Sequence, residues 1–380
     1  MLRPKLLYFL YYAAAASLLP FLVLYYEQLG LSGRQIGVLG ALLPLMTLFG
    51  VPLWSNLADK QGRHRMFVLV AIGGTIVFTL VTLYMENYLG LLLSVGALSL
   101  FTAPIMPLVD HITLTLLKEQ RNRYGALRLW GAVGWGIAAP VTGFMTERTG
   151  LQLAFILATA LLALLWAASY TLPKSETDKT DGGPRKRLPL TRAWFGFLLA
   201  AFTGGVCLAV SSTFLYLHMA DLGIGAGIVG LALTVATLSE LPVFWLSSRL
   251  LLRYPAPTLL VAALALFALR LGLYAFVTAP WLLLTIQLLH GATFSLLWVA
   301  GVAYAAASAP AGRGATAQGL FTATTMGLGG TVGALVGGVL YDILGASGMF
   351  GVVASAVVVI CIGLGLLGFV NRLPSRQGAR

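Results

Sequence analysis

Long apolar stretches, separated by short polar segments, run along almost the whole chain. A stretch of about 20 apolar residues is what an α-helix needs to cross the hydrocarbon core of a bilayer. The pattern therefore predicts an all-α integral membrane protein with twelve transmembrane helices in two six-helix bundles. We place these helices at residues 5–27, 34–57, 66–86, 89–117, 124–145, 151–172, 192–219, 224–249, 256–278, 281–307, 314–340 and 346–371.

One polar segment is long enough to be a linker. Residues 173–190 read PKSETDKTDGGPRKRLPL, which is rich in charge, glycine and proline. Such a composition is typical of a flexible surface segment. We therefore predict a first bundle at residues 1–172, a linker at 173–190 and a second bundle at 191–380. Two parallel repeats of this kind place a binding site between them near the middle of the bilayer.

The composition supports a membrane protein and argues against a soluble one. Hydrophobic residues make up 59% of the chain and charged residues only 9%, whereas soluble domains carry about 25% charged residues. The first apolar stretch is followed at once by a second, with no small-residue cleavage site between them. We interpret it as a retained helix and not as a signal peptide.

The basic residues lie almost entirely in alternate loops. Twenty of the 24 Lys and Arg residues fall at the two termini, in the linker and in the loops on the same side, and only Arg34 and Arg148 fall on the opposite side. By the positive-inside rule, both termini and the linker are expected in the cytoplasm, with the protein in the inner (plasma) membrane. The net charge of +12 then reflects membrane topology, and we expect no nucleic-acid partner.

The sequence contains no pattern typical of a cofactor, a metal site or a catalytic centre. Cys207 and Cys361 fall inside predicted helices, far apart and without metal-ligand spacing, so we interpret them as small apolar packing residues. We find no clustered metal ligands, no Ser–His–Asp set and no glycine-rich phosphate loop. We therefore expect neither an enzyme nor a bound cofactor.

Four charged residues lie inside predicted membrane helices: Asp110 and Arg128 in the first half, and Glu240 and Arg270 in the second. A charge at the bilayer centre costs about 2.5 to 3.5 kcal/mol on insertion scales, so such residues are functional candidates. One acid and one arginine in each half is what a polar substrate pathway would require. A structural ion pair between helices is the alternative interpretation.

The loop after the second predicted helix carries a recognisable motif. Residues 55–65 read SNLADKQGRHR, which resembles the G-x-L-A-D-[RK]-x-G-R-[RK] signature of the major facilitator superfamily, except that Ser55 replaces its first glycine. The resemblance implies that Asp59, Gly62, Arg63 and Arg65 support the switch between inward-open and outward-open states.

Within that superfamily, the first half resembles the lactose-permease-like proton symporters and their relatives for nucleosides and phenylpropionate. Asp110 is followed 18 residues later by Arg128, and Trp135 lies seven residues further on. The resemblance implies that Asp110 and Arg128 bind polar groups of a substrate while Trp135 offers a flat apolar face. Because Arg128 and Trp135 are two helical turns apart, they share one face of their helix.

The second half matches the same branch in part. Glu240 corresponds to a substrate-binding acid, and Arg270 and His290 correspond to residues beside the proton site. The departures are Thr293 for the protonated carboxylate, Gln287 for a lysine and Met326 for another lysine. Burial favours a neutral carboxyl group, so we expect Glu240 to carry the coupled proton, with Arg270 opposing its uptake. His290 is the second candidate, because imidazole titrates near neutral pH.

These observations predict a monomeric secondary active transporter that works by alternating access. Its predicted activity is proton-coupled uptake of a small polar or amphipathic solute, namely a sugar, a nucleoside or an aromatic acid. A drug–proton antiporter is the main alternative, although paired charges argue against the apolar cavity that it needs. A non-transporting membrane sensor is a further alternative.

Overall fold

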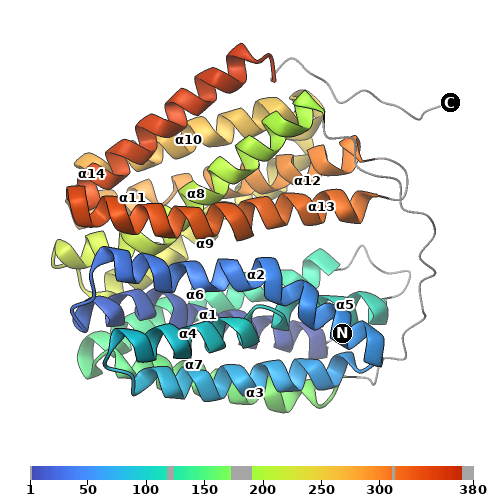
Figure 1. Ribbon diagram of the computed structural model, residues 1–380, viewed down its shortest axis with the longest axis vertical. Helices are drawn as coiled ribbons and strands as arrows, with labels where there is room; N and C mark the ends of the chain where they lie inside the picture. Colours follow the sequence, from blue (N-terminus) through green and yellow to red (C-terminus); the bar gives the residue numbers. More distant parts are fainter. Residues whose placement is uncertain (1, 118–123, 173–190, 310–312, 370–380) are drawn as a thin grey trace. The chain divides into compact units, whose positions relative to one another are not determined.

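The computed structural model describes residues 2–117, 124–172, 191–309 and 313–369, and within these ranges it contains helices and no strands (Figure 1). The helices are α1 (Leu2–Gln28), α2 (Gly33–Gln61), α3 (His64–Leu83), α4 (Tyr88–Thr102), α5 (Ile105–Leu117), α6 (Tyr124–Thr149), α7 (Gln152–Ser169), α8 (Arg192–Asp221), α9 (Ala226–Arg253), α10 (Ala256–Phe276), α11 (Pro280–Ile286), η2 (Gly291–Ser295), α12 (Leu296–Ser308), α13 (Gly314–Thr322), η3 (Ala323–Gly329) and α14 (Gly330–Leu366). Here η denotes a π-helix.

Helices coincide with all twelve predicted membrane spans, and the predicted all-α membrane fold is confirmed. Ten helical stretches in the described ranges are long and apolar enough to cross a membrane. The last of them, Thr316–Leu366, is 51 residues long and covers the two final predicted spans. Helix α6 has the length but is not among the ten.

Three predicted spans are less regular than the sequence indicated. Span 89–117 divides into α4 and α5 at Ala103 and Pro104, where proline has no N–H to continue the helix. Span 281–307 divides between α11 and η2. The loop predicted between the last two spans is instead a kink within α14, where Gly345 takes a φ of 67°. Glycine reaches this left-handed region without a steric penalty.

The chain forms two compact units, Met1–Lys179 with Tyr216–Thr234, and Thr180–Leu215 with Val235–Arg380. Residues 216–234 join the first unit through contacts with α6. There Glu147 accepts a hydrogen bond from the Gly227 N–H at 3.1 Å, and Thr234 donates one to the Gly136 carbonyl at 2.9 Å. The predicted linker at 173–190 lies outside the described residues, and the division into two six-helix bundles stays a prediction.

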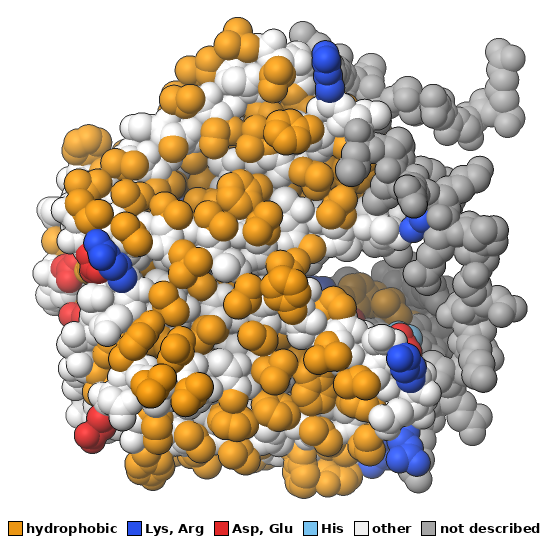
Figure 2. Space-filling model, viewed as in Figure 1, with side chains coloured by type: hydrophobic (Ala, Val, Ile, Leu, Met, Phe, Trp, Pro, Cys, Tyr) orange, Lys and Arg blue, Asp and Glu red, His pale blue; other side chains and the backbone are white. Residues whose placement is uncertain are grey.

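The described surface is apolar in a way that suits lipid. In Figure 2, hydrophobic side chains cover the face in view, while Lys, Arg, Asp and Glu gather near its left and right borders. Large side chains such as Phe276, Trp281 and Leu93 are 87%, 67% and 67% exposed. Exposed apolar surface of this extent marks a membrane-facing protein. Inside the first unit, α1 contributes much of the core, with Leu7 and Tyr8 almost fully buried.

Candidate functional site

The first unit brings Asp110 and Arg128 together. One Arg128 guanidinium nitrogen lies 3.6 Å from Asp110 Oδ2, so the two helices α5 and α6 share an ion pair. On the other carboxylate oxygen, the Tyr8 hydroxyl of α1 donates a hydrogen bond at 2.5 Å. Tyr8 is fully buried, so its hydrogen bond restricts the position of the Asp110 carboxylate. The predicted pairing of this acid and this arginine is therefore present in the structure.

Arg128 keeps part of its guanidinium accessible. It donates hydrogen bonds to the hydroxyls of Tyr124 at 2.9 Å and Tyr12 at 3.4 Å. Its side chain is nevertheless 47% exposed, against 21% for Asp110. The ion pair with Asp110 is longer than an ideal charge-assisted hydrogen bond, and the arginine side chain is accessible. Arg128 therefore has N–H donors that a solute could use.

Two glycines allow α6 to approach α1 closely enough for these contacts. A Cβ atom on Gly131 would overlap the Tyr12 ring, and one on Gly134 would overlap the Phe9 carbonyl oxygen. Any larger residue would push α6 away from α1 and separate Tyr12 from Arg128. Trp135 follows in the same helix and is half-buried. Within the described residues, no hydrogen bond or ring contact joins Trp135 to Asp110 or Arg128, so its predicted stacking role stays a prediction.

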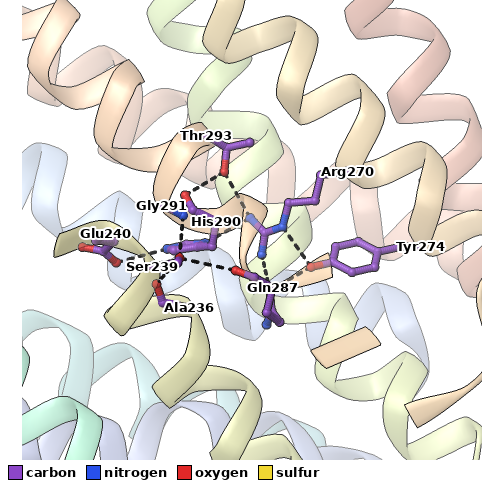
Figure 3. Close-up of polar contacts among 9 residues, drawn as sticks. All are labelled: Ala236, Ser239, Glu240, Arg270, Tyr274, Gln287, His290, Gly291 and Thr293. Carbon is purple, nitrogen blue, oxygen red and sulfur yellow. Dashed lines mark hydrogen bonds and ion pairs between the residues drawn. The ribbon is translucent and has the colours of Figure 1, made fainter. Parts of the chain in front are cut away.

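The second unit brings Glu240, His290 and Arg270 into one chain of contacts (Figure 3). His290 Nε2 lies 3.3 Å from a Glu240 carboxylate oxygen, and Arg270 contacts His290 Nδ1 at 3.0 Å. Arginine has only donors, so Nδ1 must accept and the imidazole proton must sit on Nε2. His290 is then a neutral bridge that donates to Glu240 and accepts from Arg270.

Arg270 is only 2% exposed, and a buried charge needs hydrogen-bond partners. It donates to Tyr274 at 2.9 Å, to Gln287 at 2.5 Å and to Thr293 at 3.4 Å, in addition to His290. Tyr274 in turn donates to Gln287 at 2.8 Å. Every one of these partners is neutral, so Glu240 balances the arginine charge through the imidazole and not by direct contact.

Ser239 of α9 bonds to the predicted span 281–307 at the point where this span breaks between α11 and η2. Its hydroxyl accepts a hydrogen bond from the Gly291 N–H at 2.8 Å and donates to the Ala236 carbonyl at 2.6 Å. A Cβ atom on Gly291 would overlap the Ser239 backbone. The break between α11 and η2 thus frees a backbone donor that Ser239 satisfies. This contact places His290 beside Glu240.

The signature loop forms a sharp turn between α2 and α3. Gly62 has a φ of 63°, and its N–H and that of Arg63 bond to the Asp59 and Ala58 carbonyls, which ends α2. The Asp59 carboxylate lies 2.8 Å from Nε2 of His64. The His64 ring is buried and stacks on His111 of α5 at 4.3 Å.

The two arginines of the signature loop, Arg63 and Arg65, lie in different surroundings. Arg65 lies over the Tyr170 ring at 5.6 Å, and Arg63 occupies the position just before α3. The structure therefore anchors the loop to α5 and α7, while the role of Asp59, Gly62, Arg63 and Arg65 in switching stays a prediction.

Sequence reasoning missed two neutral residues of the second cluster. Tyr274 and Ser239 complete its polar contacts, yet each looks like an ordinary helix residue in the sequence. The one useful signal was helical spacing, since Arg270 and Tyr274 are one turn apart, as are Ser239 and Ala236. Both cysteines are free thiols. In the part of the chain that the structure describes, no three His, Cys, Asp or Glu side chains gather as metal ligands.

Comparison with known proteins agrees with this architecture. Residues 1–352 match the profile of the MFS_1 like family. The chain belongs to this family of major facilitator transporters. It is 31% identical to the maltose permease of Geobacillus stearothermophilus over 345 residues, which covers 89% of this chain and 86% of the relative. A probable 3-phenylpropionic acid transporter of Escherichia coli is 26% identical, with 91% and 92% covered.

The solved structure of the nucleoside transporter NupG has the same fold, with a TM-score of 0.84 at 19% identity over 97% of this chain and 98% of that one. The family and the fold identify this chain as a multi-pass membrane transporter of small solutes. The predicted resemblance to the major facilitator superfamily is thereby confirmed.

Proposed function

We propose that this transporter imports a neutral, hydroxyl-rich solute of the sugar class together with protons. The observation that carries the proposal is the charge balance within each cluster. Asp110 neutralises Arg128 in the first unit, and Glu240 neutralises Arg270 through His290 in the second. Neither cluster has a spare cation for a carboxylate substrate.

This balance separates the aromatic acid from the two neutral classes, the sugars and the nucleosides. A free aromatic acid carries a net negative charge, and its carboxylate would have to compete with Asp110 for Arg128. A sugar brings hydroxyl groups that both donate and accept. Such groups can bond to the carboxylate and the accessible guanidinium at once, without adding charge. The similarity to a maltose permease over most of both chains favours the same class.

The geometry of the first cluster suits a hydroxylated ring. Arg128 offers partly exposed N–H donors, and the hydroxyls of Tyr12 and Tyr124 lie beside it. Trp135, on the same face of α6, would supply an apolar surface for the faces of sugar rings that carry only C–H groups. In this proposal, Asp110 and Arg128 select the hydroxyl pattern, while Trp135 adds affinity for the ring.

The second cluster supplies the coupling. A proton arriving at Glu240 neutralises the carboxylate and removes the charge that balances Arg270. His290 would then face a neutral carboxyl group instead of a carboxylate while still bonded to the arginine. A buried arginine without its counter-charge is unstable, so the proton changes which arrangement of the helices is favoured. In this proposal, the bundles 1–172 and 191–380 move by alternating access. The carrier is a monomer in the plasma membrane, with both termini in the cytoplasm.

The test is ligand-dependent thermal stabilisation followed by transport. Purified protein is screened against maltose, a nucleoside and 3-phenylpropionate, because a ligand at 100 times its dissociation constant stabilises by about 2.7 kcal/mol. Labelled uptake into proteoliposomes is then measured with and without an inward proton gradient. Stabilisation by maltose and gradient-driven accumulation support the proposal. Binding of only the aromatic acid, or efflux of apolar drugs, would replace it with the acid transporter or with the exporter.

A further inference from the structure

The C-terminal turns of α9 carry two arginines stacked on aromatic rings. The Arg249 guanidinium carbon lies 5.2 Å from the centre of the Trp245 ring, and that of Arg253 lies 5.6 Å from the Tyr254 ring. Both arginines are exposed. An arginine placed over an aromatic ring still carries N–H donors that can bind a phosphate. Within the described ranges, neither arginine forms an ion pair with a carboxylate, so two positive charges remain uncompensated.

An exposed apolar stripe leads up to these arginines. At 3.6 residues per turn, the stripe and the two arginines fall within an arc of about 120°. Glu240, which faces His290, lies about 140° around the helix from Trp245 by the same geometry. The stripe consists of Leu238, Leu241, Trp245 and Leu252, which are 58%, 42%, 73% and 89% exposed.

The length of this surface matches one lipid molecule. From Leu238 to Arg253 the helix rises about 22 Å, at 1.5 Å per residue. One leaflet of a bilayer, headgroups included, is about 20 to 22 Å thick. Arg249 and Arg253 lie in the last two turns of α9, about 17 Å and 22 Å from Leu238 along the helix axis. If Leu238 lies at the bilayer centre, both arginines fall beyond the roughly 15 Å of hydrocarbon in one leaflet, at the level of the headgroups.

We propose that this surface of α9 is a binding site for one anionic phospholipid. The acyl chain lies along Leu238 and Leu241, Trp245 sits at the level of the ester groups, and the phosphate lies between Arg249 and Arg253. A free phosphate ion would gain only the two arginines and would leave the leucines exposed. A zwitterionic lipid would bring its own ammonium group toward the arginines. The positive charge of the two arginines and the length of the apolar stripe together favour an anionic lipid.

The experiment titrates dioleoyl-phosphatidylglycerol into the purified full-length protein in detergent and follows the thermal unfolding midpoint. Parallel titrations use dioleoyl-phosphatidylcholine and inorganic phosphate. We expect a saturable rise in midpoint with phosphatidylglycerol alone. Because a basic residue near an anionic lipid contributes about 1 kcal/mol, Arg249→Gln and Arg253→Gln should each weaken the apparent affinity about fivefold.

Arg148→Gln is the matched control, since it removes one exposed arginine from the last turn of α6. It should leave the phosphatidylglycerol titration unchanged, whereas Trp245→Leu should weaken it. Equal responses to the two lipids, or unchanged affinity in both α9 arginine variants, would overturn the proposal. A midpoint rise with phosphate as large as that with phosphatidylglycerol would also overturn it, because the apolar stripe would then contribute nothing. None of these readings depends on transport.

Discussion

His290 Nε2 lies 3.3 Å from the Glu240 carboxylate, although the two residues come from different helices 50 positions apart. The other ring nitrogen is occupied by Arg270. The imidazole can therefore gain a second proton only if the arginine moves away. Glu240 has no such obstacle, because its side chain is 20% exposed and pairs with His290 alone among the charged groups of the described residues. This asymmetry favours Glu240 over His290 as the proposed proton carrier.

Replacing Glu240 with glutamine removes the titrating group and keeps an acceptor for His290. We expect Glu240→Gln to abolish proton-driven accumulation in proteoliposomes while equilibrium exchange of labelled solute continues. Uptake with and without an imposed proton gradient, alongside counterflow, measures both properties. Accumulation at the wild-type level would contradict the assignment.

Arg128→Ala should weaken solute binding by about 10- to 100-fold, the cost of losing one or two hydrogen bonds to a charged group. Arg128→Lys should recover only part of this, because an ammonium group cannot reproduce the planar fork. Titration of the thermal midpoint with maltose gives the affinities. Arg148→Ala serves as the control and should bind as the wild type does. Full binding in Arg128→Ala would place the site elsewhere.

Gly291→Ala should destabilise the protein by about 1 to 3 kcal/mol, the usual cost of overpacking, because its Cβ atom would overlap the Ser239 backbone. It should also impair coupling, since α9 and the broken helix would separate and move Glu240 away from His290. Thermal unfolding and gradient-driven uptake report the two effects.

Gly272→Ala is the matched control for that substitution. Gly272 lies within α10, and a Cβ atom there meets nothing within 4 Å. The variant should be as stable as the wild type or slightly more so, because alanine favours helix. A stable, fully coupled Gly291→Ala protein would show that the close approach of α9 is unimportant.

Asp59→Asn removes the charge that faces His64 and leaves a hydrogen-bonding side chain in place. If the signature loop supports switching, the variant should slow uptake and exchange severalfold while the affinity for solute stays unchanged. Initial rates of counterflow and thermal-shift titrations separate rate from binding. A change in affinity without a change in rate would assign Asp59 to the solute site and not to the switch.

The membrane character, the helical spans and the candidate charges all follow from the amino-acid sequence alone. Runs of about 20 apolar residues have few folded solutions other than transmembrane helices. Charges such as Asp110 and Glu240 stand out against these runs, because burying a charge is costly. The signature motif and the two acid–arginine sets are evident for the same reason, since each is a polar exception in an apolar chain.

Which of these groups meet depends on the packing of the helices. Ser239 and Tyr274 are polar groups that a helix can also hold without a distant partner, so nothing in their local sequence marks them. Ser239 nevertheless bonds to Gly291, 52 residues away, and Tyr274 to Gln287, 13 residues away. The partner of Tyr8, Asp110, is 102 residues away. The break near Gly291 likewise depends on a neighbouring helix, because Ser239 accepts a hydrogen bond from the Gly291 N–H. Local pattern predicts an element, whereas packing between elements decides its breaks and its contacts.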